Sequence, residues 1–342
     1  MVQDKKCTGC GNKLIFNPTT QRMYCEYCRT ERDVIPDKKK EIEEISKDLD
    51  VYSCPNCGAQ IVCDSTTTST FCVYCKNTAI LKDKLKGKFE PQAIIPFKTT
   101  KDEAVKAFID LRVGKKLIPD EFLHESNIEE IRGVYIPFWL FDYKVDGILD
   151  ARATREDKKN MGNKTVVTTY EYHVARRGAV SFDNIPIDGS THFQDNVMRS
   201  LEPFNYTDLK KYTSDYLSGF LSELYDVEEE VADDIAAERS KLTAYNSFKK
   251  SIDSQEYNTV EYINNNFEPT KLRADYVLLP VWMLNVKYKD EFYTFAMNGQ
   301  TKRIVGNIPV DEEKAKKMMI KKSLINIVVL LIIAIIIWKV VW

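Results

Sequence analysis

The sequence predicts an α+β protein built of three successive parts, and three observations support this fold class. All nine cysteines lie between residues 7 and 75 of the 342 residues. The middle of the chain alternates between strand-like and helix-like patterns, and the last twenty residues are almost entirely apolar. Hydrophobic residues make up 44% of the chain and charged residues 29%, so we expect most of it to fold.

The overall charge and the positions of the cysteines limit which ligands and which cellular compartment we expect for this protein. With 49 basic and 51 acidic residues, the net charge of -2 provides no overall attraction to nucleic acid or anionic lipid. The chain opens with MVQDKKCTGC, which lacks the apolar stretch of a secretory signal. We therefore expect the cysteines to face a reducing cytosol, where C-x-x-C pairs are more often metal ligands or redox centres than disulfides.

The cysteines form a duplicated unit. Each unit reads C-x-x-C, then fourteen residues, then C-x-x-C, and the second unit follows the first at an offset of 47 positions. Two residues between cysteines form a tight turn that directs both sulfurs at one ion, and two such turns complete a tetrahedral zinc site. The predicted ligands of two Zn²⁺ ions are Cys7, Cys10, Cys25 and Cys28 in the first zinc ribbon and Cys54, Cys57, Cys72 and Cys75 in the second.

Residues around the ligands support the same interpretation. Gly11 and Gly58 directly follow the first pairs, where closing the turn favours a positive φ. Arg29 and Lys76 follow the second pairs and can offset the negative charge of four thiolates. The competing interpretation is a pair of thioredoxin-like redox centres, which would require a strand–helix context. Cys63 is the odd cysteine and reads as an apolar strand residue.

The central region, residues 86–312, predicts an antiparallel-sheet α+β domain. A helix is expected to begin after the Thr99–Thr100 pair, with its apolar face at Ala104 and Phe108. Residues 133–153 and 163–182 alternate as strands do, and the polar segment 155–164 is expected to form a hairpin tip between them. Helices are expected at 217–252 and around 257–267, followed by strands over 274–310 with a turn at Asn298–Gly299.

Two segments of this domain resemble copies of one strand. They read IPFWL from Ile136 and LPVWM from Leu279, which suggests a pseudo-duplicated antiparallel sheet. The remaining predicted boundaries are 1–35 for the first ribbon, 36–50 for a linker helix, 51–85 for the second ribbon, 313–322 for a basic segment and 323–342 for a transmembrane helix.

The chain shows no catalytic signature, and we expect it not to be an enzyme. It contains no G-x-S-x-G, no Walker lysine loop, no H-E-x-x-H and no dinucleotide fingerprint. His124, His173 and His192 lie far apart without a motif around them, which favours ordinary structural roles. The acidic run from Asp226 to Asp234 could be a cation site, but a solvated helix face is the preferred interpretation.

The C-terminal twenty residues predict a single membrane span. At 1.5 Å per residue they reach roughly 30 Å, about the thickness of the hydrocarbon core. By the positive-inside rule a basic flank stays in the cytosol, which predicts a single-pass protein of the cell membrane with a cytoplasmic N-terminus that also contacts membrane lipid. The lysines of this membrane flank are Lys314, Lys316, Lys317, Lys321 and Lys322.

Several motifs together resemble a known family. The C-x-x-C ribbons, YIPFWLFDY, DNIPIDGS, MNGQTKRIVGNIPVD and the basic-flanked tail are similar to those of bacterial TFIIB-type zinc-ribbon membrane proteins. This resemblance covers nearly the whole chain. It implies a role in phage-shock-like envelope-stress responses, with an SPFH-domain protein and a PspA-like protein as partners, and another membrane protein as a further candidate.

Two functional hypotheses follow. The first is a non-enzymatic, membrane-anchored scaffold whose ribbons and central domain recruit cytosolic partners. The alternative is a membrane-tethered, nucleic-acid-binding regulator. Residues 1–40 hold nine basic and five acidic residues, and residues 51–88 hold five and two, so the ribbons are only mildly basic. No run of interleaved arginine and aromatic residues marks a stacking surface, and we do not expect nucleic acid as a partner.

Overall fold

The computed structural model contains a large mixed sheet, a three-stranded sheet and helices, which confirms the α+β class for the described residues. Strands β11 and β7 pair in parallel with β8 and β12, respectively. The central sheet is therefore mixed, and the prediction of a purely antiparallel sheet was wrong. The described residues are 7–12, 14–36, 50–53, 58–63, 81–84, 91–113, 117–191, 195–223, 225–253, 257–289 and 291–341.

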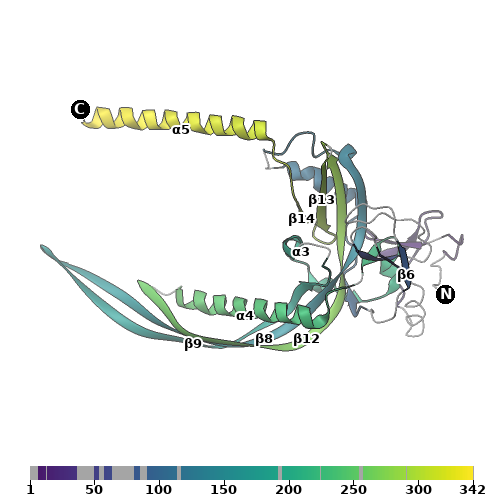
Figure 1. Ribbon diagram of the computed structural model, residues 1–342, viewed down its shortest axis with the longest axis horizontal. Helices are drawn as coiled ribbons and strands as arrows, with labels where there is room; N and C mark the ends of the chain where they lie inside the picture. The colour runs from purple at the N-terminus through teal and green to yellow at the C-terminus, as the bar shows by residue number, and fades with distance from the viewer. Residues whose placement is uncertain are drawn as a thin grey trace.

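Three long strands dominate the molecule: β8 (Ile128–Met161), β9 (Lys164–Asp188) and β12 (Thr259–Tyr288). β8 lies between the other two and pairs antiparallel with both. The register shifts by one residue at several points, including one between Lys271 and Arg273, and such bulges bend a strand and increase its twist. Figure 1 shows the result, a curved arm that sweeps away from the N-terminal part of the chain.

The far end of the arm is a two-stranded ribbon. Pairing of β12 with β8 ends at the Thr259–Thr154 pair, whereas β8 and β9 continue to a tight turn at Gly162, which has a φ of 66°. The predicted hairpin is therefore confirmed, but segment 155–161 is strand rather than loop. Its side chains are exposed on both faces, so no alternation of polar and apolar residues marks it in the sequence.

Helix α4 (Glu229–Asp253) covers the inner face of the arm, as Figure 1 shows. Ala244 and Ile252 of the helix pack with Val145 and Leu149 of β8 in one apolar cluster. The predicted helix at 217–252 is thus confirmed only from residue 229. The helix predicted around 257–267 was wrong, because this segment pairs along β8 as the first part of β12.

Shorter elements complete the fold. Helix α2 begins as predicted, because the Thr100 side chain accepts from the Glu103 backbone N–H and Glu103 in turn accepts from the Thr100 N–H. The other elements are β4 (Asp50–Ser53), β5 (Gln60–Cys63), β6 (Leu81–Lys84), β7 (Ala93–Ile94), α2 (Lys101–Ile109), α3 (Asp195–Leu201), β10 (Lys210–Lys211), β11 (Leu221–Glu223), β13 (Glu291–Asn298), β14 (Ile304–Gly306) and 3₁₀ turns at Asp110–Arg112, Glu125–Asn127, Tyr206–Asp208 and Ser214–Leu217.

The two repeated segments pair with each other. Ile136 of the first lies opposite Leu279 of the second, so β8 and β12 meet antiparallel at their most buried stretches. The pairing shows that the two segments are neighbours, and the pseudo-duplication of one strand stays a prediction. The Asn298–Gly299 turn lies where predicted, between β13 and β14, and the Asn298 side chain accepts from the backbone N–H groups of Gln300 and Thr301.

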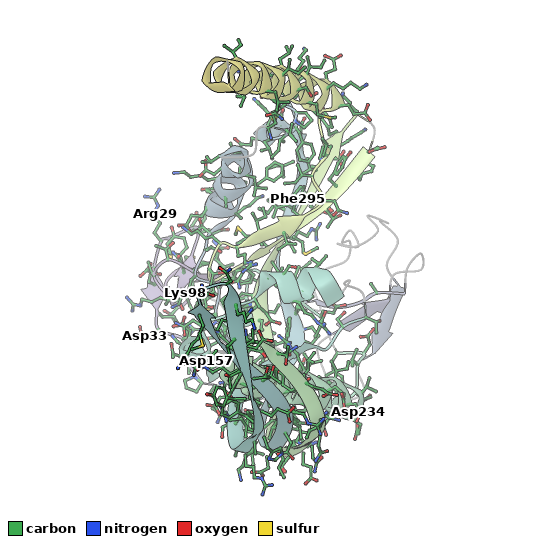
Figure 2. All side chains as sticks on the ribbon, turned by 90° about the vertical axis from the view of Figure 1, so that its left-hand side faces the viewer. Arg29, Asp33, Lys98, Asp157, Asp234 and Phe295 are labelled. Carbon is green, nitrogen blue, oxygen red and sulfur yellow. The ribbon has the colours of Figure 1, made fainter. Side chains whose placement is uncertain are left out.

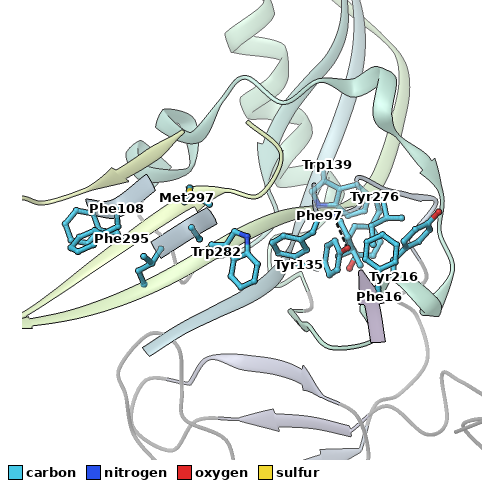
Figure 3. Close-up of a cluster of buried hydrophobic side chains, with 14 of the residues drawn as sticks. Phe16, Phe97, Phe108, Tyr135, Trp139, Tyr216, Tyr276, Trp282, Phe295 and Met297 are labelled. Atoms are coloured by element: carbon cyan, nitrogen blue, oxygen red, sulfur yellow. Dashed lines mark hydrogen bonds between the residues drawn. The ribbon is translucent and has the colours of Figure 1, made fainter. Parts of the chain in front are cut away.

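An aromatic cluster fills the core at the base of the arm (Figure 3). The Phe97 ring stacks on Phe220 with centroids 4.2 Å apart, and it meets Tyr135 and Trp282 edge to face. The indole N–H of Trp282 donates to the Thr99 hydroxyl at 2.9 Å, which removes the cost of burying this polar group. The cluster joins β8 and β12 to the chain that precedes α2.

Helix α5 (Glu312–Val341) contains the basic segment 313–322 and continues through residue 341 of the apolar segment, although the two were predicted as separate units. Its first turns carry acidic and basic side chains, including ion pairs of Lys316 with Glu312 and of Lys317 with Glu313. In the part of the chain that the structure describes, we find no helix whose length and hydropathy together suffice to cross a membrane. This finding contradicts the predicted transmembrane helix at 323–342 and the predicted single-pass localisation in the cell membrane.

Replacing Phe97 by alanine should strongly destabilise the base of the arm. The side chain is fully buried among three aromatic rings, and phenylalanine-to-alanine changes in cores cost about 3–5 kcal/mol. Urea denaturation followed by tryptophan fluorescence measures the change, with Phe292→Ala as the control, because Phe292 is 54% exposed. Equal midpoints for the two variants would show that the cluster does not carry the stability assigned to it.

Candidate metal centre

The first zinc ribbon folds as a small three-stranded antiparallel sheet of β1 (Leu14–Asn17), β2 (Arg22–Cys25) and β3 (Glu31–Arg32). The turn between β1 and β2 is held by the Asn17 side chain, which accepts from the backbone N–H of Thr19 at 2.9 Å. This is an Asx turn, which asparagine favours. This hairpin fills the fourteen-residue spacer between the two cysteine pairs.

Two tight turns present the cysteines. In the first, the Gly11 N–H donates to the Cys7 carbonyl at 2.8 Å, and Gly11 has a φ of 76°. In the second, the Arg29 N–H donates to the Cys25 carbonyl at 2.8 Å, and Arg29 has a φ of 61°. The predicted positive φ is thus confirmed at Gly11, and also at Gly58 of the second ribbon. Arg29 adopts this region despite its Cβ atom, which the sequence did not indicate.

The four sulfurs converge on one point. The Sγ atoms of Cys7 and Cys28 lie 3.3 Å apart, those of Cys10 and Cys25 lie 3.5 Å apart, and all four are within 4.8 Å of one another. Zinc–sulfur bonds of about 2.3 Å in a tetrahedron place sulfurs roughly 3.8 Å apart. The spacing therefore fits a four-thiolate zinc site, and this cysteine cluster could hold a metal ion.

The surroundings of Cys28 and Cys10 shift the pKa values of the two thiols in opposite directions. The hydroxyl and the backbone N–H of Thr30 hydrogen-bond to Cys28, and they lower the pKa of this thiol to about 6. For Cys10, the backbone N–H of Asn12 lowers the pKa, but desolvation and hydrogen bonding to the other thiols outweigh it and raise the pKa to about 12. Four thiols this close cannot all ionise without a cation. A bound divalent ion would supply the missing positive charge.

The ligands of the second ribbon lie outside the described residues. Cys54, Cys57, Cys72 and Cys75 are therefore not placed, and neither is the predicted linker helix, most of which falls in 37–49. The described strands β4, β5 and β6 are antiparallel neighbours and join the large sheet where β11 pairs with β5. Cys63 lies on β5, which agrees with its interpretation as a strand residue.

The first ribbon is bound tightly to the central domain through a buried carboxylate. The Arg32 guanidinium donates to both oxygens of Asp215, at 2.8 and 3.3 Å, and the Ile35 N–H donates to the same carboxylate at 3.0 Å. The Asp215 side chain is only 4% exposed. Bidentate pairing of this kind fixes geometry as well as charge, so it sets the orientation of the ribbon on the domain.

Backbone and aromatic contacts extend this attachment. The Phe16 N–H donates to the Ser218 carbonyl at 3.0 Å, and the Phe16 ring meets Tyr216 edge to face. The Gln21 side-chain amide donates to the Phe97 carbonyl at 2.7 Å, which links the ribbon to the aromatic cluster of the core. None of these contacts was predicted, because no local pattern reveals which surface a ribbon will cover.

The other residues singled out in the sequence do not gather into a site within the described part of the chain. The imidazole of His124 bonds to the Ser126 hydroxyl within a 3₁₀ turn, and that of His173 lies 4.0 Å from Asp150 on the exposed arm. His192 lies outside the described residues. The lysines at 314, 316, 317, 321 and 322 occupy the first turns of α5, where Lys314 pairs with Asp120 at 2.8 Å.

Removing one ligand should abolish metal binding at the first ribbon. We expect Cys28→Ser to lower the zinc content of the purified chain by one ion, because three thiolates do not complete the tetrahedral site. Elemental analysis of the protein after dialysis measures this loss. The matched control is Cys63→Ser, which removes a cysteine outside the four-sulfur cluster. Unchanged zinc content in Cys28→Ser would exclude this cysteine as a ligand.

Replacing Thr30 by valine should make zinc binding more sensitive to acid. Losing the hydroxyl donor raises the pKa of Cys28, and zinc binds the thiolate, so protons compete with the metal at higher pH. The backbone N–H of Thr30 still donates to Cys28 in the variant, so we expect a modest rise in the pH at which zinc is released. A chromogenic chelator that reports released zinc during acid titration gives the midpoint. The idea fails if the midpoint does not rise.

The comparisons with known proteins give one strong match. The chain is 36% identical over 317 residues to a Bacillus subtilis (strain 168) protein named "Uncharacterized protein YdjG", and the match covers 92% of each chain. No model of a protein family matches the sequence, and no solved structure does. The chain therefore belongs to the same family as YdjG of Bacillus subtilis.

Proposed function

We propose that this protein is a non-enzymatic scaffold whose zinc ribbons bind protein partners. The observation that carries the proposal is the position of the first ribbon. The ribbon is fixed to the core through Asp215 and Phe97, while residues 8–12 and 26–30 of the two cysteine turns are exposed. A small domain held in this way presents its turns in a fixed orientation, which limits the entropy lost when a partner binds.

The exposed turns carry a side chain suited to protein recognition. Tyr27 lies between the last two ligands and is 78% exposed, and Arg29 beside it is also exposed. Arg29 projects at the edge of the molecule in Figure 2. Tyrosine and arginine are the residues that most often contribute strongly at protein interfaces. We propose that a second zinc ion in the second ribbon, bound by Cys54, Cys57, Cys72 and Cys75, supports a similar surface.

Charge pairing within the ribbon supports protein recognition over nucleic-acid binding. Arg22 pairs with Glu31 and Asp33, and Arg32 pairs with the buried Asp215. These two arginines already have carboxylate partners. The described part of the ribbon therefore offers few cations for the phosphate contacts on which nucleic-acid affinity depends.

The resemblance to TFIIB-type zinc-ribbon proteins suggests which partners to test. It implies an SPFH-domain protein and a PspA-like protein, with a role in the envelope-stress response. The ribbons and the central domain would bring such partners together, and simultaneous binding raises the effective concentration of one partner for the other. The name of the Bacillus subtilis relative states no activity, and the partners to test are those that the resemblance implies.

The Tyr27→Ala variant tests the scaffold directly. We expect it to reduce recovery of the SPFH-domain and PspA-like proteins in affinity purification of the full chain by about tenfold, since interface anchors contribute upwards of 1.4 kcal/mol. Zinc content should not change, because the Tyr27 side chain points to solvent. The control is Val113→Ala, which alters another highly exposed residue, 82% exposed, in the loop after α2.

Two outcomes would count against the proposal. Recovery of these partners equal to that of the control would remove Tyr27 from the interface. Equal recovery in Cys7→Ser, after loss of zinc is verified, would remove the ribbon as a whole. A gel shift at low salt that weakens as salt is added would instead support the nucleic-acid alternative.

A further inference from the structure

Helix α4 presents two apolar stripes, and only one of them is covered. The covered stripe consists of small residues at positions 232, 236, 240 and 244, which are buried against the arm. Small side chains let the helix backbone approach the sheet closely. Gly147 on β8 serves the same purpose, because a Cβ there would lie only 2.5 Å from the Phe267 ring and 3.2 Å from Phe248 of the helix.

The second stripe of α4 is exposed. Val231, Ile235 and Leu242 are 56%, 36% and 61% exposed, respectively. With Glu238 between them they follow steps of four, three and four residues, the spacing of a seam in which two helices pack side by side. Single exposed aliphatic residues are ordinary on a protein surface. Three along one line of α4, which lies on the concave side of the arm in Figure 1, indicate a contact surface.

The charges of α4 are segregated along its length. From Glu228 to Glu238 every charged residue is acidic, whereas from Arg239 to Lys250 every charged residue is basic. Several of these groups are engaged within the molecule. Lys271 pairs with Glu229 and Asp233, Arg239 pairs with Glu202, and Lys241 pairs with Glu238 of the same helix. The outward charges are Glu230, Asp234, Glu238, Lys241 and Lys250, all exposed, and Asp234 lies at the edge of the molecule in Figure 2.

The helix dipole explains only part of this distribution. Acidic residues in the first turn and basic residues in the last turn stabilise a helix by interacting with its dipole. That effect fades within one turn, whereas Glu238 and Lys241 lie in the middle of the helix. The dipole also gives no reason for the exposed aliphatic stripe. A surface that is both apolar and oppositely charged at its two ends is complementary to a copy of itself turned end to end.

We propose that two copies of this chain associate through the exposed stripes of their α4 helices, packed antiparallel about a two-fold axis. This inference does not depend on the proposed function. The antiparallel arrangement places the acidic half of each helix against the basic half of the other. It also buries Val231, Ile235 and Leu242 of both copies in one interface. A parallel arrangement would place like charges together, which the charge pattern disfavours.

The first test removes the apolar contact. Sedimentation equilibrium of the full chain should show a dimer, and Leu242→Glu should raise its dissociation constant at least tenfold. The matched control is Leu272→Glu, which alters a residue of equal exposure, 61%, on β12 and should leave the dimer unchanged. All samples contain the same non-ionic detergent, because α5 also exposes aliphatic side chains. A monomeric wild type, or equal dissociation constants for wild type and Leu242→Glu, overturns the proposal.

The second test establishes the antiparallel order. One variant combines Glu230→Lys with Glu238→Lys, and another combines Lys241→Glu with Lys250→Glu. Each should weaken self-association, because like charges then face each other, whereas an equimolar mixture of the two should form a heterodimer as tight as the wild-type dimer. The control reversal, Glu312→Lys with Glu313→Lys on α5, should have no effect. Failure of the mixture to recover dimerisation contradicts an antiparallel interface.

Discussion

The structure depends on the continuous antiparallel pairing of β8 with β12. Their ladder runs from the Thr154–Thr259 pair on the arm to the Ile128–Val286 pair in the core, and the register shifts along it bend the strands without ending the pairing. Three other parts pack directly on this ladder. β9 extends its outer edge, α4 covers its inner face, and the aromatic cluster around Phe97 packs on its base.

The candidate metal centre is connected to this ladder by a short chain of contacts. The four thiols of the ribbon could hold a metal ion, and a bound ion would supply folding energy to a segment with so small a core. The ribbon in turn reaches the core through Arg32 and Asp215 and through the bond from Gln21 to the Phe97 carbonyl. We therefore expect metal binding, ribbon folding and the seating of the ribbon on the domain to be coupled.

The sequence predicted the features that local chemistry determines. The C-x-x-C spacing indicated the four converging sulfurs, and the Thr100–Glu103 capping box marked the start of α2. Alternation also identified the buried parts of β8 and β12.

Alternation failed for 257–267, because a polar segment with three consecutive asparagines becomes a strand only through its partner β8. The Arg32–Asp215 pair could not be predicted either, since its members lie 183 residues apart. The apolar C-terminal run suggested a membrane span that the described helices do not support.

Hydrogen–deuterium exchange with and without a zinc chelator tests most directly whether the metal centre holds the ribbon on the core. If metal binding, ribbon folding and seating are coupled, chelation should abolish protection in β1, β2 and β3. Protection should also fall at the Ile35 amide, which donates to the Asp215 carboxylate of the domain, while the β8–β12 ladder stays protected. Unchanged protection of the ribbon after verified zinc removal would contradict this account.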